Sequence, residues 1–367
     1  MPSRRRFLEA LGAAAAWPAI PRAASRSPGG PRLVAAWDTP HGSRVGVLSV
    51  AGTAPLGARV ESGLAVPTRA HAITRVTDDT VLVVARRPGD WIVRACFDPR
   101  TQRLRAQAWQ WIEADRAFNG HAIVTPDGRR VLTTETDQET GLGLIGVRDA
   151  ATLAKVDEWP TQGLDPHELL WIGAADRARV AVANGGIATL PETGRAKHDL
   201  PAMDPSLVLL DAASGALEGQ WRLPDSRLST RHLAQAHGTI AIALQAEHDD
   251  AQARGRAPVL ALFDGRTLLP IAAPQALAGY GGSVVALPNG FAVSCPRAGG
   301  VARFAQDGAW VGFLPLPEAC PLAVDGDAIL AGGAGSILRS GPANAGQARI
   351  AGAGPLTLDN HWVRLTS

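Results

Sequence analysis

A short motif recurs along the 367-residue chain at long intervals and limits the architectures open to it. Three segments, DPRTQRLRAQAWQW, DAATLAKVDEWP and DAASGALEGQWRLP, begin at Asp98, Asp149 and Asp211, and each carries a Trp at nearly the same distance after a turn. Weaker copies contain Asp264 and Asp307, so the intervals between the aspartates are 51, 62, 53 and 43 residues. Self-similarity with this period is typical of the blades of a β-propeller.

The segments between the motif copies have the patterning of strands. Alternating and β-branched residues lie between Gly, Pro and Asp turns, as in HAIVTPDGRRVLTTE, and long stretches with a period of 3.6 are missing after the N-terminal segment. Each repeated Asp is expected to accept hydrogen bonds from backbone amides in a hairpin between two outer strands. An open β-sandwich is the alternative, but a sandwich does not require a regular repeat.

Both ends of the chain contribute to one blade in this interpretation. Runs over residues 32–38, 43–50 and 58–66 have no inner strand of their own, and the C-terminal run LDNHWVRL has too little chain after it to complete a blade. We therefore predict an all-β, seven-bladed β-propeller over residues 31–367, closed by N- and C-terminal strands in one blade. The expected inner strands begin at His71, His121, His167, His232, Gly282, Cys320 and His361.

The N-terminal segment resembles an export signal. SRRRFL at residues 3–8 has the twin-arginine form, and an apolar stretch and small residues near Ala23 follow it. We predict a twin-arginine signal peptide at residues 1–24, a linker at residues 25–30, and a periplasmic mature protein. The apolar run is too short and too rich in Ala to span a bilayer, and no segment of the mature chain has the length and apolarity of a membrane span.

Charge and cysteine spacing exclude several classes of function. Residues 1–24 contain four arginines and one glutamate, so the net charge of +2 falls to −1 without them, and no basic stripe indicates nucleic-acid binding. The cysteines Cys96, Cys295 and Cys320 lack the CxxC or CxxCH spacing of a thiolate metal site or a c-type haem. A disulfide between Cys295 and Cys320 and buried free thiols both stay open.

Five of the seven expected inner-strand starts are histidines. The first strands of propeller blades line the central channel, and each second strand returns to the same face, so polar residues at these positions gather at one mouth. Neutral imidazole is the commonest protein ligand for transition metals. The alternative is a hydrated mouth whose histidines bond water and backbone. We predict metal ligands at His71, His121, His167, His232 and His361, and ligand-binding groups at Arg86, Glu135, Asn184 and Gln245.

Further roles follow from sequence neighbours of these histidines. Asp165 and Glu168 are candidates to contact His167 and orient its ring toward a metal. However, alternation along a strand sends the Glu168 side chain to the opposite side from His167. Glu135 beside His121 is a candidate acid/base pair. The mature chain has no GxSxG elbow, no HExxH and no phosphate loop.

Several motifs resemble an uncharacterised family of twin-arginine-exported propellers of the YVTN and quinoprotein-amine-dehydrogenase type. The motifs are FNGHAIVTPDGRRVLTTETD, IGVRDA, GLDPHELLW, VANGGI, PETGRAK, STRHLA and LDNHW, and the likeness spans the mature chain. The resemblance implies that the recurrent histidines of the family fall on the five named above. Members are encoded near imelysin-like and di-haem peroxidase-like proteins, which implies iron as the metal and periplasmic iron-uptake proteins as partners.

Two functions stay open at this point. The first is a periplasmic protein, expected to be monomeric, that binds a metal ion, a metal chelate or a small polar ligand at its histidine-rich mouth and works in iron uptake. The second is a propeller enzyme, a hydrolase, lyase or oxidoreductase, with its site at the same mouth. The fold alone does not choose between them. A rigid interaction scaffold needs neither the histidines nor the carboxylates.

Overall fold

The computed structural model describes residues 30–51, 56–173, 178–189, 196–341, 345–351 and 357–365. The expected signal peptide at residues 1–24 and most of the expected linker lie outside this part. Its helical elements are the short helix α1 (Ala251–Arg256) and the 3₁₀ turn η3 (Leu200–Ala202). In the described residues no helix has the length and apolarity needed to cross a membrane.

Twenty strands form five separate antiparallel four-stranded sheets. The first two sheets are β4 (Ala70–Arg75), β5 (Thr80–Ala85), β6 (Trp91–Asp98), β7 (Arg103–Trp111), and β8 (Arg116–Val124), β9 (Arg130–Asp137), β10 (Leu142–Asp149), β11 (Lys155–Leu164). The third is β12 (Pro166–Ile172), β13 (Arg179–Asn184), β14 (Ser206–Asp211), β15 (Leu217–Trp221). The last two are β16 (Leu228–Ala236), β17 (Thr239–Ala246), β18 (Leu260–Phe263), β19 (Leu268–Ile271), and β20 (Ser283–Leu287), β21 (Gly290–Cys295), β22 (Gly300–Ala305), β23 (Trp310–Pro315).

Eight further strands form one closed array. They are β1 (Arg32–Thr39), β2 (Gly42–Val50), β3 (Ala58–Ala65), β24 (Leu322–Asp325), β25 (Ala328–Gly333), β26 (Ser336–Ser340), β27 (Ala345–Ala351) and β28 (Thr357–Leu365). The runs β28-β1-β2-β3 and β24-β25-β26-β27 are antiparallel, and only short parallel pairings join them, of β24 with β28 and of β27 with β3. The two ends of the chain therefore pair in one sheet, as the sequence predicts.

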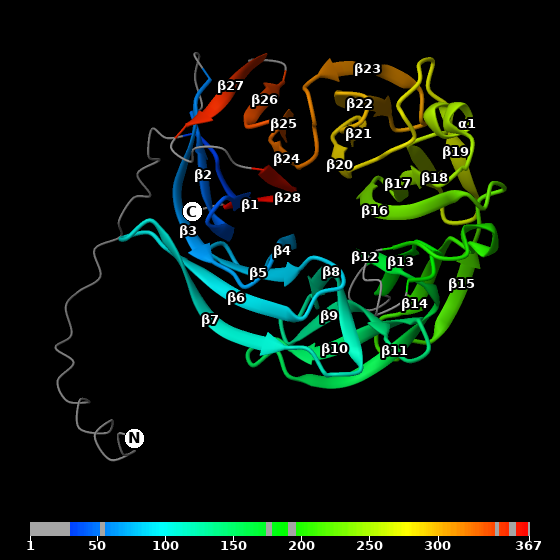
Figure 1. Cartoon of the computed structure of the whole chain (residues 1–367), viewed down its shortest axis with the longest axis horizontal. Coiled ribbons are helices and arrows are strands. Elements are labelled where there is room, and N and C mark those ends of the chain that lie inside the picture. Colours follow the sequence, from blue (N-terminus) through cyan, green and yellow to red (C-terminus); the bar gives the residue numbers. More distant parts are fainter. Residues whose placement is uncertain are drawn as a thin grey trace.

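The sheets lie around a common centre (Figure 1). The innermost strands contact one another in a closed ring that runs through β4, β8, β12, β16, β20, β24, β28 and back to β4. The hydrophobic core lies between neighbouring sheets, where Leu82 of β5 packs with Val131 of β9, and Leu209 of β14 with Ile242 of β17. The fold is thus an all-β propeller, as predicted, with five separate blades and the eight-stranded array.

The repeated aspartates close the outer hairpins, which confirms their predicted role. The carboxylate of Asp98 accepts from the Arg100 amide at 2.9 Å, and that of Asp149 accepts from the Thr152 amide at 2.9 Å. The same contact recurs from Ser214 to Asp211 at 2.8 Å. The sequence repeat is therefore a repeat of turn chemistry at the rim of the ring.

The three cysteines are free, so the disulfide left open between Cys295 and Cys320 does not form. Burial raises the pKa of each of these two thiols to about 12, which makes both unreactive at neutral pH.

Candidate functional site

All five predicted histidines meet at the centre of the ring. Their imidazole rings come from β4, β8, β12, β16 and β28, and neighbouring ring centroids lie as close as 4.6 Å for His167 and His232 and 4.7 Å for His121 and His361. His71, His121, His167 and His232 are buried, and His361 is partly buried. We call these five residues the histidine cluster. The prediction that they converge is correct.

Each histidine lies at an irregularity of its innermost strand. His71 and His167 are the second residues of β4 and β12, whereas His121, His232 and His361 lie further inside β8, β16 and β28. The pairing register shifts between Ala70 and Ile73 in β4, and between Thr230 and Leu233 in β16. The same happens around His121, His167 and His361 in β8, β12 and β28. The innermost strands without histidine, β20 and β24, pair without a shift along their described partners. β-Bulges re-aim side chains and are common next to functional sites, which explains how five imidazoles reach one point.

Four members of the cluster have the spacing of a metal site. One ligand atom from each of His71, His121, His232 and His361 lies within 4.8 Å of the others. The Nε2 atoms of His71, His121 and His361 are buried and have no hydrogen-bond partner among the described residues. Burying a polar atom without a partner costs free energy, so these nitrogens are available to bind a small ligand such as a metal ion.

Carboxylates contact the Nδ1 atoms of three of these four rings. The Nδ1 atom of His71 lies 3.2 Å from Asp359 Oδ1. Glu168 contacts two rings, with Oε2 at 3.2 Å from His232 Nδ1 and Oε1 at 3.5 Å from His121 Nδ1. A carboxylate on one imidazole nitrogen fixes the ring and leaves the other nitrogen to a metal, which is the usual arrangement behind metal-bound histidines.

The expected carboxylate partners of His167 are wrong. Glu168 contacts His121 and His232 instead, from the irregular part of β12 between Pro166 and Leu169, where regular alternation does not hold. Asp165 binds arginines instead: its Oδ2 accepts from Arg231 Nη1 at 2.7 Å, and its Oδ1 accepts from Arg87. His167 itself lies 3.3 Å from His232, Nε2 to Nε2, and its Nδ1 has no partner in the described part of the chain.

The charge states of the cluster and of its carboxylate Glu168 favour a bound cation. Burial, followed by the nearby His121 and Arg86, lowers the pKa of His71 well below its usual value. Burial also lowers the pKa of His167 and of His361 well below the usual value. These imidazoles are therefore neutral at pH 7, which is the form that binds a metal. Burial disfavours the charged form of Glu168, but His121 and His232 outweigh it and hold the pKa of this carboxyl well below its usual range.

Arg86 shares a carboxylate with the histidine cluster. Its Nη1 atom lies 3.3 Å from Asp359 Oδ1, the same oxygen that contacts His71, and Arg69 Nε donates to Asp359 Oδ2 at 2.5 Å. Asp359 therefore joins two arginines to the cluster. Sequence reasoning missed it, because the contact joins residues 288 positions apart, although Asp359 stands two residues before a predicted histidine ligand.

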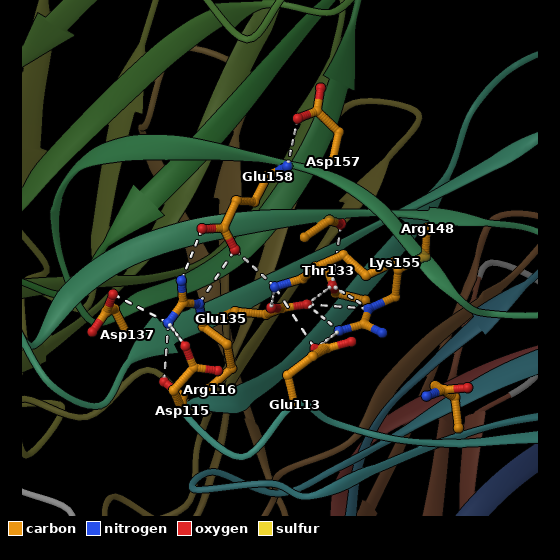
Figure 2. A network of polar contacts seen from close by, with 12 residues as sticks. Glu113, Asp115, Arg116, Thr133, Glu135, Asp137, Arg148, Lys155, Asp157 and Glu158 are labelled. Atoms are coloured by element: carbon orange, nitrogen blue, oxygen red, sulfur yellow. Dashed lines mark hydrogen bonds and ion pairs between the residues drawn. The ribbon is translucent and has the colours of Figure 1, made fainter.

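The expected pairing of Glu135 with His121 is wrong. Thr134 Oγ1 contacts the His167 carbonyl of the neighbouring blade at 3.2 Å, so Thr134 faces that blade and the next residue of β9 points to the opposite face. There the fully buried Glu135 carboxylate accepts from Arg148 Nη2 at 2.8 Å and lies 2.9 Å from Lys155 Nζ. Figure 2 shows this network, which lies within the sheet of β8 to β11.

Asn184 and Gln245 contact the protein backbone rather than the histidine rings. Asn184 Nδ2 donates to the Thr161 carbonyl at 2.8 Å, and Gln245 Nε2 donates to the Gly281 carbonyl at 3.3 Å. Both residues lie at the ends of second strands, as the sequence suggests, but these hydrogen bonds connect strands and loops. Of the four expected ligand-binding residues, only Arg86 shares a partner with the cluster.

Comparisons with known proteins give a family and a fold. The family described as "Protein of unknown function (DUF1513)" matches residues 64–365. No curated protein matches the chain. A similar solved structure is the periplasmic gluconolactonase PpgL of Pseudomonas aeruginosa, with a TM-score of 0.61 and 15% identity, over 90% of this chain and 99% of that one. At this identity the likeness shows the propeller fold alone.

Proposed function

Because the chain belongs to this family of unknown function, its activity must come from its own site, and we propose that it binds a transition-metal ion through His71, His121, His232 and His361. The observation that carries the proposal is that, among the described residues, the buried Nε2 atoms of His71 and His121 have no partner while a carboxylate contacts the Nδ1 atom of each ring. In the same part of the chain His361 Nε2 also has no partner, and Glu168 contacts His232 Nδ1. A merely structural histidine would have its nitrogens satisfied by the protein.

The type of ligand atom limits which metals fit the site. Four imidazole ligands suit Zn, Cu, Fe or Ni and are a poor set for Mg or Ca, which prefer oxygen. His167, 3.3 Å from His232, is in reach as a further ligand. Among the suitable ions, iron is the one that the sequence resemblance indicates, and imelysin-like iron-uptake proteins are the proposed partners of a monomeric protein.

Metal titration of histidine variants tests this proposal. Chelator-treated protein is incubated with Fe²⁺ or Zn²⁺, desalted, and analysed for bound metal and thermal stability. The parent should keep about one ion and gain stability, since a ligand that binds only the native state stabilises it. H71A/H121A should fold but lose both effects, whereas H237A, which alters an exposed turn histidine, should keep them. A parent that never holds metal, with destabilised H71A/H121A, would return these residues to a structural role.

We propose seven blades for the ring. The closed series of innermost strands has seven members, and the runs β28-β1-β2-β3 and β24-β25-β26-β27 are joined by only one and two residue pairs. Each run then counts as one blade. The pairing of β1 with β28 inside one of these blades leaves fewer free strand edges where the ring closes. An experimental structure in which these eight strands form one continuous sheet would contradict the count.

We propose the periplasm as the location, with residues 1–24 as a twin-arginine signal. The support is the SRRRFL motif and the periplasmic location in the name of the similar gluconolactonase. Replacing Arg4 and Arg5 by Lys should trap the precursor in the cytoplasm, because the export receptor reads the arginine pair rather than positive charge. Unimpaired export of this variant, measured by cell fractionation, would count against the route.

A metal-assisted hydrolase is the second candidate. It is favoured by the fold shared with a gluconolactonase and by a histidine cluster at the centre of the ring, where a bound ion could polarise a carbonyl. The discriminating assay measures gluconolactone hydrolysis by metal-loaded parent and by H71A/H121A. A rate that depends on the cluster would favour the enzyme. Equal rates for both proteins would leave metal binding as the function.

A further inference from the structure

In the described part of the chain, a fully buried arginine beside the histidine cluster has two of its three guanidinium nitrogens without a hydrogen-bond partner. Arg231 Nη1 donates to Asp165 Oδ2 at 2.7 Å, but its Nε and Nη2 atoms have no hydrogen-bond partner among the described residues. These two atoms form one edge of the guanidinium. This edge presents two parallel N–H groups, the geometry that binds both oxygens of a carboxylate or phosphate. Leaving such donors unpaired in the interior costs free energy, so the edge indicates an absent oxyanion.

The guanidinium of Arg231 is held in place rather than free to turn away. Arg87 donates to the other oxygen of Asp165, so the two arginines share one carboxylate. Gly185 leaves room for this pair, since a Cβ there would come within 2.7 Å of Asp165 Oδ2 and 2.8 Å of Arg231 Nη1. Hydroxyls of Ser229 and Thr230 in β16 donate to the Gly185 and Asn184 carbonyls at 2.7 Å each.

Positive charge exceeds negative charge around the open edge. Arg87, Arg231 and Lys197 face two carboxylates, Asp165 and Glu247, of which Glu247 pairs with Lys197. Burial lowers the pKa of Lys197, and the nearby Arg231 and Arg87 lower it further. One positive charge therefore remains uncompensated at this place, and burial makes it costly.

Arg231 lies close enough to the histidine cluster to act on it electrostatically. Arg231 directly precedes His232 in the irregular part of β16, and Asp165 stands two residues before His167. Arg87 follows Arg86, which shares Asp359 with His71. Burial lowers the pKa of His167, and Arg231 contributes to that lowering. A divalent ion on neutral imidazoles would add two positive charges to the one already in excess, which favours an anionic second ligand.

We propose that the mouth of the ring binds a small oxyanion, a carboxylate or a phosphate, on the Nε and Nη2 edge of Arg231, with Arg87 beside it and the histidine cluster next to it. The role of this anion as a co-ligand of the metal rests on the proposed function, but the anion site itself needs no metal. It identifies the ligand class: a small organic acid or a phosphate compound, alone or as a metal chelate.

Calorimetric titration of chelator-treated protein tests the site without metal. Citrate and inorganic phosphate are titrated separately at constant ionic strength, and the anion that binds tightly identifies the class. R231Q/D165N removes the arginine and its carboxylate together, so that the net charge of the site is unchanged, and should weaken binding about tenfold or more, the effect of losing a charge-assisted pair of hydrogen bonds. The matched control R222Q/D204N removes an exposed pair with bonds of 2.5 and 2.8 Å and should bind like the parent.

Two outcomes would overturn the proposal: no binding of either anion to the parent, or equal binding by parent and R231Q/D165N. Should R231Q/D165N fail to fold, R87Q leaves the Arg231–Asp165 bond intact, and unchanged affinity in R87Q would contradict the charge argument. Failure of the metal proposal is distinguishable, because H71A/H121A should still bind the anion. An anion site with no metal binding would therefore reject only the proposed function.

Discussion

At the scale of single residues, Glu168 determines how the cluster would hold an ion. One carboxylate reaches Nδ1 of both His121 and His232, and it also accepts from the Leu233 amide at 2.9 Å. Its negative charge both orients two rings and raises their basicity toward a metal. No other described carboxylate contacts two members of the cluster.

We predict that Glu168→Gln lowers metal affinity about 10- to 100-fold, because the amide keeps the shape but loses the charge behind two ligands. Competition with a chromogenic chelator measures this change. Glu218→Gln serves as the control, because Glu218 is an exposed carboxylate that pairs with Arg179. Metal affinity equal to that of the parent would mean that Glu168 only fills space.

The residues of the cluster were predictable from sequence, whereas their partners were not. His71, His121, His167, His232 and His361 occupy equivalent places in a repeated unit, so symmetry alone brings them together. The contacts of Asp359 and Glu168 join different blades and depend on side-chain direction at a bulge. No periodicity in the sequence specifies that direction.

At the scale of elements, the innermost strands and the outer parts of the sheets have different roles. The bulges of β4, β8, β12, β16 and β28 aim the histidines, while regular pairing elsewhere holds the blades together. The network of Figure 2 stabilises a blade and does not aim a histidine. In it the fully buried Arg148 binds Glu135 and Glu113 at 2.8 and 2.9 Å. Its guanidinium also lies 4.8 Å from the Phe118 ring.

We predict that Glu135→Gln lowers the free energy of unfolding by about 3 kcal/mol, because it leaves Arg148 and Lys155 without a buried counter-charge. Metal binding should be unchanged, since this network does not touch the cluster. Urea denaturation and metal analysis measure the two effects, with the exposed turn variant Glu139→Gln as control. Lost metal binding at full stability would restore Glu135 to the site.

At the scale of the whole molecule, the ring places distant parts of the chain around one point. β28, at the C-terminal end, pairs with β1. It places His361 beside His71, 290 positions earlier in the chain. The all-β class, the closure by both chain ends and the Asp turns followed from the repeat in the sequence. The joined array of eight strands did not, because short parallel contacts between blades depend on how closely the closing strands approach.

X-ray absorption at the zinc edge, on protein loaded with one equivalent of Zn²⁺, tests the central claim most directly. The account predicts nitrogen neighbours at about 2.0–2.1 Å, with the outer-shell scattering of several imidazoles, and loss of this signal in H71A/H121A. A first shell of sulfur, or of oxygen without imidazole scattering, would contradict it.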